Sequence, residues 1–189
     1  MFQFVILGIV ILLWIGGVTY LSAALFYRMT RKELFVPFVP IDSAGVDAMA
    51  RASKIVGNER VVDIGSGWGT ILFALLDRYP KLQVTGIEIN PFLHLFAKLR
   101  GWLFHRSSSY QLFRGDAANF SFEAYEVVFL FMLSPFVDRV LVPKFEKELK
   151  SGTRVVSYVF PMQSKAFTEE KISMNSQGWR NAVYVYTKK

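Results

Sequence analysis

Cysteine is absent from this chain of 189 residues, and only two histidines are present. Without cysteine there is no disulfide framework, no thiolate metal site and no cysteine nucleophile. His94 and His105 cannot form a zinc site by themselves, because such sites use three or four ligands. The same shortage leaves few candidates for a Ser-His-Asp hydrolase. The sequence therefore predicts no metal site.

Charged side chains are missing from residues 2–27, and all 37 of them lie from Arg28 onward. A helix rises about 1.5 Å per residue, so this apolar run is long enough to cross a hydrocarbon core of ~30 Å. A cleaved signal peptide would have a basic start and an apolar stretch of only about 7–15 residues. We therefore expect residues 2–27 to form one uncleaved transmembrane helix that contacts membrane lipid.

Basic residues follow the apolar run directly, at Arg28, Arg31 and Lys32. Because segments rich in Lys and Arg stay on the cytoplasmic side, we expect a single-pass protein whose soluble part is cytoplasmic. Residues 28–54 then form a basic flank, a proline-containing connector and an N-terminal helix, and residues 55–189 form the catalytic domain. The net charge of +7 suits anionic lipid or nucleic acid, but most of it is scattered, and we expect no nucleic-acid partner.

Apolar strands and helices alternate from Arg60 onward. The expected strands are residues 61–64, 83–89, 110–113, 126–133 and 153–160, separated by helices at 70–78, from 91 and at 137–149. Continuous apolar strands that alternate with helices are typical of a parallel sheet covered on both faces. Residues 169–173 and 182–187 are two further strands with no helix between them. The sequence therefore predicts an α/β fold whose tail is an antiparallel hairpin at one sheet edge.

A glycine-rich loop follows the first strand, in the sequence DIGSGWG at residues 63–69. Glycines at this place let the chain turn tightly and let a nucleotide approach the main chain. A nicotinamide fingerprint would need a glycine at position 70, where this chain has Thr70. No Gly-Lys-Ser/Thr sequence is present either, so the P-loop pattern fails.

Two acidic residues follow the next two strands. Glu88 stands 21 residues after Gly67, where doubly wound folds place an acid that accepts hydrogen bonds from a ribose diol. Asp116, in the sequence RGDA at residues 114–117, can accept from the exocyclic amine of adenine. These positions predict a nucleoside site at the carboxyl ends of the strands.

The loop, the acid and the GDA sequence occur in the order typical of class I S-adenosylmethionine-dependent methyltransferases, which the chain resembles over roughly residues 55–189. More narrowly, it resembles the anchored family that includes the lysine methyltransferases of the ATP-synthase c-subunit and the adenine nucleotide translocase. PFVP at 37–40, GIEINPF at 86–92, KELKSGTRVVS at 147–157 and FP at 160–161 carry that resemblance.

The resemblance implies a Rossmann-like methyltransferase fold, with a mostly parallel seven-stranded sheet whose last strand is antiparallel. It also implies S-adenosyl-L-methionine as cofactor and a lysine of a membrane protein as acceptor. The residues assigned to the cofactor are Asp63, Gly65, Ser66, Gly67, Glu88, Ile89, Asp116 and Ala117.

The acceptor site is expected at the end of the fourth strand, where Ser134 would orient an amine and Phe136 would form a wall with Phe38 and Trp68. Two alternatives stay open: methylation of a lipid or quinone-like molecule, and a non-catalytic S-adenosylmethionine-binding module. The second is prompted by Trp68 and Thr70, which stand where the family usually has an acid and a base.

Overall fold

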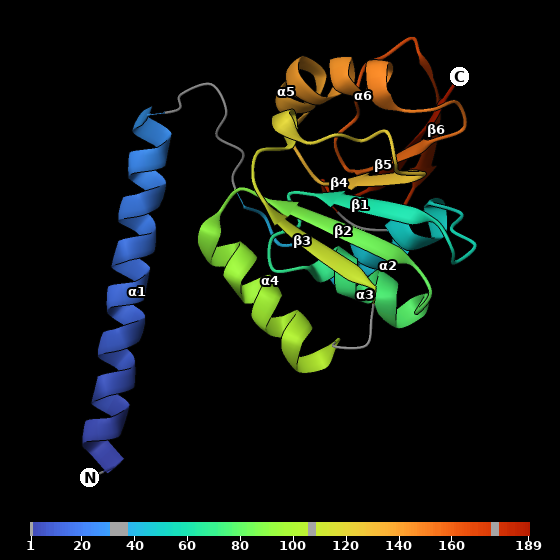
Figure 1. Cartoon of the computed structure of the whole chain (residues 1–189). Coiled ribbons are helices and arrows are strands. Elements are labelled where there is room, and N and C mark those ends of the chain that lie inside the picture. Colours follow the sequence, from blue (N-terminus) through green and yellow to red (C-terminus); the bar gives the residue numbers. More distant parts are fainter. Residues whose placement is uncertain (1, 31–37, 106–108, 175–177) are drawn as a thin grey trace. The chain divides into compact units, whose positions relative to one another are not determined.

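The computed structural model describes residues 2–30, 38–105, 109–174 and 178–189, which divide into two compact units, Met1–Pro37 and Phe38–Lys189. The first unit contains helix α1 (Phe2–Thr30) (Figure 1). Its stretch Ile6–Ala23 is long and apolar enough to cross a membrane, and none of it is buried. Arg31, Lys32 and the side chain of Arg28, used above to orient the chain, lie outside the described residues.

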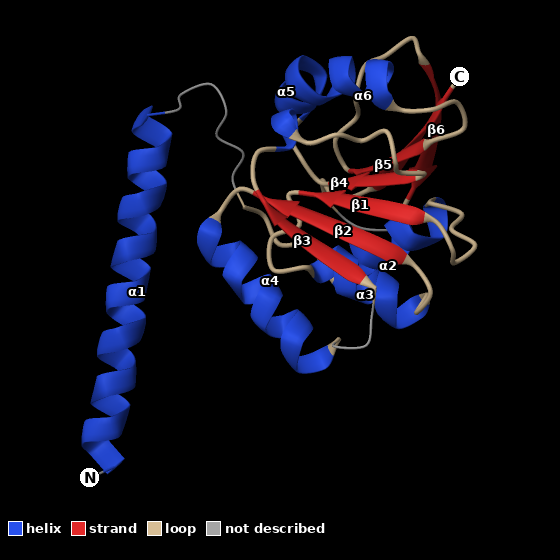
Figure 2. Cartoon of the chain, in the orientation of Figure 1, coloured by secondary structure: helices blue, strands red, loops and turns tan. Residues whose placement is uncertain are grey.

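The second unit is a sheet with helices on both faces (Figure 2). Its helical elements are α2 (Ser43–Ala52), α3 (Thr70–Arg78), α4 (Pro91–Phe104), η1 (Ala117–Asn119), α5 (Ser134–Phe136), η2 (Val137–Leu141) and α6 (Val142–Glu148). Its strands are β1 (Arg60–Ile64), β2 (Gln83–Glu88), β3 (Tyr110–Arg114), β4 (Val127–Leu130), β5 (Arg154–Tyr158), β6 (Phe167–Ser173) and β7 (Ala182–Lys188).

The seven strands form one sheet in the order β3-β2-β1-β4-β5-β7-β6. Strands β1 to β5 are parallel, and β7 is antiparallel to both of its neighbours. This order confirms the expected Rossmann-like methyltransferase fold and its antiparallel last strand. The hairpin of β6 and β7 closes one edge, as the absence of a helix between those segments predicted.

Two apolar clusters hold the layers together. One lies between α2, α3 and the sheet, with Met49, Leu72 and Phe129 at its centre, and the other lies between η2, α6 and the opposite face, with Leu141 and Phe145. All five side chains are fully buried. Figure 1 shows α3 and α4 on one side of the sheet and α5 and α6 on the other.

The fourth strand is shorter than the apolar sequence at 126–133 predicted, because β4 ends at Leu130. Leu133 is extended and Pro135 stands in the first turn of α5, so the following helix begins at Ser134 rather than at 137. The next turn, η2, is a π-helix in which the Val142 N–H donates to the Val137 carbonyl. A wider turn there accommodates Pro143, whose ring would clash with a carbonyl of a regular α-helix.

Candidate active site

The carboxyl ends of the parallel strands β1 to β4 lie along one edge of the sheet, and the segments that follow them form the candidate site. In open α/β sheets this edge is where ligands bind. The segments are the glycine loop after β1, Ile89 and Asn90 after β2, residues 115–117 after β3 and residues 131–134 after β4. Sequence positions far apart are thereby brought together.

Main-chain hydrogen bonds hold the glycine loop against the end of β2. The N–H groups of Gly65 and Ser66 both donate to the Ile87 carbonyl, at 2.9 and 3.0 Å. Gly67 has φ of 55°, and a Cβ at that position would lie 2.7 Å from Cε2 of Phe38. A side chain at 67 is therefore opposed both by backbone conformation and by the adjacent ring.

Glu88 ties together three of these segments. Its Oε2 accepts from the Gly67 N–H and its Oε1 from the Asn90 N–H, each at 2.8 Å, and its carbonyl accepts from Gly115 N–H at 3.0 Å. The side chain is buried, and this burial raises the pKa of Glu88 against the bonds from Asn90 and Gly67, which lower it. Each carboxylate oxygen keeps a lone pair for a further donor.

Asp63 is the second buried carboxyl of the site. Burial, and secondarily the charge of Glu88, raise the pKa of Asp63 to about 7, opposed by a hydrogen bond from the Leu72 main chain. Its Oδ2 and the hydroxyl of Ser66 are buried and have no hydrogen-bond partner among the described residues. Polar atoms in such positions normally have partners, so these two mark a place where a polar ligand would be held.

Asp116 and Ala117 lie where β3 ends, beside β2. One carboxylate oxygen of Asp116 accepts from the Ala118 N–H at 2.9 Å and caps η1, which leaves the other oxygen for another donor. Ala117 is buried, whereas Ile89 is half exposed. The structure thus brings the expected cofactor residues to one edge of the sheet, and their contact with a cofactor stays a prediction.

Ser134 is held by a strained turn at the end of β5. Its hydroxyl donates to the Pro161 carbonyl at 2.6 Å. The chain reaches Pro161 through a γ-turn at Val159, which has φ of 68° and is spanned by a bond from Phe160 N–H to the Tyr158 carbonyl at 2.8 Å. Positive φ is rare for a β-branched residue, and such strain clusters at functional sites.

Two of the three expected aromatic walls are in contact with each other. The rings of Phe38 and Trp68 pack edge to face, with centroids 5.2 Å apart. This contact gives Trp68 a packing partner on the glycine loop, where the family usually has an acid. Phe136 is half buried and has no ring contact with either of them among the described residues.

Sequence reasoning missed a second aromatic group at the ends of β4 and β5. Phe131 packs on Phe160 and on Trp179, with ring centroids 5.8 and 6.3 Å apart. The Arg180 guanidinium lies 4.9 Å from the Trp179 ring and bonds Asp42 and the Pro40 carbonyl, each at 3.0 Å. These residues come from four distant segments, and only the PFVP and FP sequences pointed to this place.

Comparison with known proteins gives a consistent family. Residues 63–169, more than half of the chain, match the family described as the ANTKMT methyltransferase domain. The chain is 30% identical over 154 residues to a protein-lysine N-methyltransferase of Saccharolobus islandicus (strain REY15A), covering 80% of this chain and 92% of that protein.

Two mouse proteins are also similar. The lysine N-methyltransferase of the ATP-synthase c-subunit is 30% identical over 162 residues, covering 84% of this chain and 62% of the mouse protein. The adenine nucleotide translocase lysine N-methyltransferase is 33% identical over 137 residues, covering 72% and 58%. The chain therefore spans about three-fifths of the length of these two relatives.

Solved structures with the same fold include an RNA methyltransferase from Salinibacter ruber in complex with S-adenosyl-L-homocysteine. Its TM-score is 0.71 at 25% identity, covering 79% of this chain and 94% of that one. A tRNA methyltransferase from B. subtilis has a TM-score of 0.64 at 13% identity, covering 80% and 68%, a likeness of fold alone.

Proposed function

The chain belongs to the ANTKMT methyltransferase family and is an S-adenosylmethionine-dependent methyltransferase, and we propose that it methylates the side-chain amine of a lysine in a membrane protein. The observation that carries the lysine acceptor is the similarity to the archaeal protein-lysine N-methyltransferase over 92% of that protein's length. The mouse relatives add two acceptors that are membrane proteins, and their likeness supports a membrane acceptor here.

The residues at the sheet edge fit this cofactor. Glu88 has lone pairs free to accept from both ribose hydroxyls, and the second oxygen of Asp116 is available to the adenine amine. Asp63 and Ser66 have buried oxygens without described partners, which suit the amino-acid end of the cofactor, since its ammonium is a donor and a cation. A nearby cation would lower the pKa of Asp63 and hold its carboxylate ionised.

When bound, S-adenosylmethionine supplies an activated methyl group, so the protein mainly has to position the acceptor. In-line transfer needs the acceptor nitrogen at about 3–3.5 Å with its lone pair aligned, and such positioning can supply most of the catalysis. A lysine must first lose a proton, which costs roughly 4–5 kcal/mol at neutral pH from a pKa near 10.4. A dry pocket lowers the pKa of an amine and reduces that cost.

Ser134 and Phe136 are the residues that we assign to the acceptor. Because the Ser134 hydroxyl gives its proton to the Pro161 carbonyl, its oxygen is left to accept an N–H from a neutral amine. That bond would direct the lone pair of the amine away from Ser134. Phe136, with Phe38 and Trp68, would exclude water, and aromatic rings also attract a lysine cation as it arrives.

The membrane would be reached through helix α1. Its 29 residues span about 43 Å, more than the ~30 Å of a hydrocarbon core. Arg28, Arg31 and Lys32 follow it in the sequence, which favours a single-pass protein with the catalytic domain in the cytoplasm. A spanning helix predicts retention in membranes through alkaline and high-salt washes, and release by salt alone would contradict it.

Two other acceptors remain to be separated from lysine by experiment. A membrane anchor is compatible with a lipid or quinone-like acceptor, and the likeness to the Salinibacter RNA methyltransferase favours RNA as the second candidate. Host membranes and total RNA are incubated with the full chain and methyl-labelled S-adenosylmethionine, then separated into protein, lipid and RNA fractions. We expect label in membrane protein. Label confined to lipid or to RNA would overturn the lysine assignment.

A further inference from the structure

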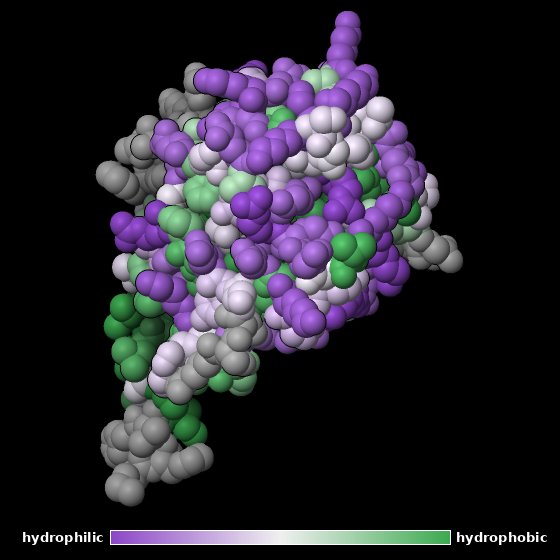
Figure 3. Space-filling view, turned by 45° about the vertical axis from the view of Figure 1, so that its right-hand side comes forward, coloured by the Kyte–Doolittle hydropathy of each residue, from purple (hydrophilic) through white to green (hydrophobic). Residues whose placement is uncertain are grey.

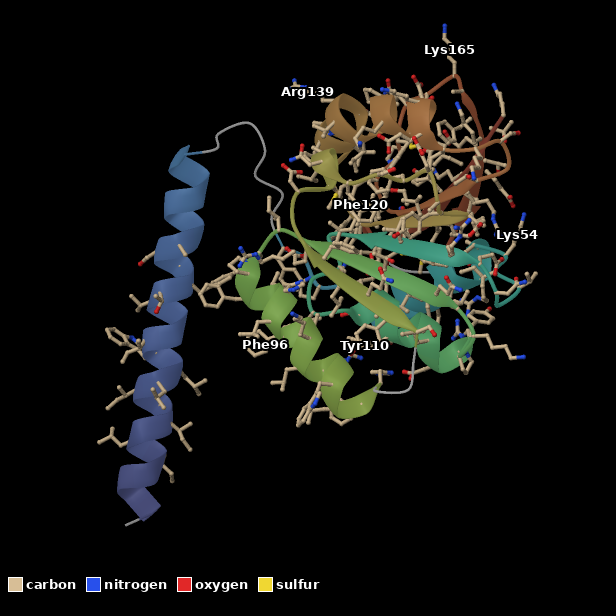
Figure 4. All side chains as sticks on the ribbon, in the orientation of Figure 1. Lys54, Phe96, Tyr110, Phe120, Arg139 and Lys165 are labelled. Atoms are coloured by element: carbon tan, nitrogen blue, oxygen red, sulfur yellow. The ribbon has the colours of Figure 1, made fainter. Side chains whose placement is uncertain are left out.

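Helix α4 exposes more apolar side chain than any requirement of its own packing explains. Six large apolar residues on it are about half or more exposed, with fractions from 49% to 63%: Phe92, Leu95, Phe96, Leu99, Trp102 and Leu103. Figure 4 shows Phe96 projecting from α4 away from the sheet. Exposed apolar patches of this kind mark sites that bind protein or membrane.

These six residues, which we call the α4 apolar stripe, lie on one face of the helix. Successive residues of an α-helix are turned by about 100°, so positions 92, 95, 96, 99, 102 and 103 share one side. The buried positions, which are Leu93, His94, Ala97 and Gly101, share the opposite side and pack toward the sheet. The helix thus has two separate apolar faces, of which its own domain covers one.

Charge around the stripe has a single sign. The sequence contains no Asp or Glu between Glu88 and Asp116, whereas it has four basic residues there. Two of these, Lys98 and Arg100, lie on α4, where the same turn of about 100° per residue places them on either flank of the stripe. An apolar face with aromatic residues, flanked by Lys and Arg, is the pattern of helices that lie in the plane of a membrane interface.

We propose that the α4 apolar stripe docks into the surface of an anionic bilayer, with the helix axis parallel to the membrane plane. Charge decides between lipid and a protein partner, since basic residues on both flanks of an apolar stripe match anionic headgroups beside acyl chains. The docking extends the proposed anchoring by α1, which would keep the domain within reach of the lipid. By contrast, the domain face seen in Figure 3 is mostly hydrophilic.

Docking through α4 would fix the orientation of the candidate active site. The helix begins beside Glu88, because its N-cap Asn90 donates its N–H to the Glu88 carboxylate. The amino end of the stripe, at Phe92, therefore starts at the same sheet edge as the glycine loop. A bilayer that binds the stripe would lie next to that edge, which suits an acceptor lysine at the level of the headgroups.

The absence of cysteine makes a direct test possible, because a single introduced cysteine can be labelled without background. The full chain is reconstituted in phosphatidylcholine vesicles with and without phosphatidylglycerol. An environment-sensitive fluorophore is placed in turn at Leu13→Cys in α1, Phe96→Cys in the stripe and Lys165→Cys. Figure 4 shows Lys165 on the side of the domain away from α4, so it serves as the exposed control. Nitroxide-labelled lipids then report which positions contact lipid.

We expect nitroxide lipids to quench the label at Leu13 in all vesicles, the label at Phe96 strongly only where phosphatidylglycerol is present, and the label at Lys165 in neither. Lys98→Gln should lower the ratio of docked to undocked α4 by about fivefold, since each basic residue near an anionic surface contributes ~1 kcal/mol. High salt should have the same direction of effect.

The outcomes separate docking from anchoring. Quenching at Leu13 without quenching at Phe96 overturns the docking and leaves the anchor intact. Quenching at Phe96 alone supports docking and contradicts the anchor. A label at Phe96 that is shielded from water but not quenched by nitroxide lipids identifies a protein occupant, either α1 or a second copy of the chain, and also overturns the proposal. Binding of S-adenosylmethionine by each variant shows that the domain is folded.

Discussion

The two halves of the candidate active site are built in different ways. On the side of β1, β2 and β3, main-chain N–H groups and the buried carboxyls of Asp63 and Glu88 hold the segments together over short distances. On the side of β4 and β5, aromatic rings, Arg180 and a strained turn at Val159 bring together four segments that are distant in sequence.

The difference separates a general task from a particular one. A cofactor common to a whole superfamily is met by glycines and acids at fixed spacing, whereas the acceptor of one enzyme is met by side chains that vary. Damage to the first half should therefore abolish binding of S-adenosylmethionine. Damage to the second half should slow methyl transfer while leaving cofactor affinity nearly unchanged.

The largest effect is expected from Gly67→Val. A side chain at this position adopts an unfavourable positive φ and meets the Phe38 ring, so the cofactor loop cannot keep its shape. Gly152→Val is the matched control, because Gly152 has φ of 86° but open space around it. Calorimetry should show no binding by Gly67→Val and normal binding by Gly152→Val. Equal affinities would remove the loop from the cofactor site.

Glu88→Ala should lower cofactor affinity at least tenfold. Each charge-assisted hydrogen bond to a ribose hydroxyl contributes roughly 1.5–3 kcal/mol, and both would be lost. Glu88→Gln, which keeps one acceptor oxygen, should lie between the wild type and Glu88→Ala. The exposed Glu123→Ala should bind normally. If a folded Glu88→Ala protein retains full affinity, the ribose assignment is wrong.

Ser134→Ala and Phe136→Ala should each reduce turnover by about tenfold, in line with the loss of one hydrogen bond or one ring contact. Affinity for S-adenosylmethionine should change only a few-fold, and Ser151→Ala, at an exposed turn, should change neither quantity. Single-turnover rates on the identified acceptor give the first number and calorimetry gives the second. Full turnover in both variants would move the acceptor elsewhere.

The smallest effect concerns pH and the ligand-free protein. Because the pKa of Asp63 is raised from 3.8 to about 7, the folded state holds a proton that the unfolded state has already lost within that window. Stability contributed by this proton is present at low pH and disappears as the pH rises toward 7. Between about pH 5 and pH 8, the wild type should lose roughly 2–3 kcal/mol from this group.

Asp63→Asn removes this dependence while keeping the size of the side chain. In a chain of this length, the difference in pH slope corresponds to about 5–10 °C in Tm. Scanning calorimetry in detergent at the two pH values measures it. Parallel pH slopes for wild type and variant would show that Asp63 titrates normally and that the site is wetter than the structure indicates.

The same contrast explains what the sequence allowed us to predict. The alternation of apolar strands and helices, the glycine spacing and the acid at Glu88 are local signals, and they led to the correct fold and cofactor. The end of β4 was missed, because Phe131 and Met132 continue the apolar run although the chain leaves the sheet at Leu130. No local pattern could show that Trp179 packs on Phe131, since only the folded sheet brings them together.

The central claim is that this edge of the sheet transfers methyl groups from S-adenosylmethionine to lysine in membrane protein. The most direct test is mass spectrometry of membrane proteins after incubation with the wild-type chain, Glu88→Ala or Ser134→Ala. The account predicts methyllysine with the wild type, almost none with Glu88→Ala, and slowed formation with Ser134→Ala. Methylated lipid or RNA without methyllysine, or equal methyllysine with Glu88→Ala, would contradict it.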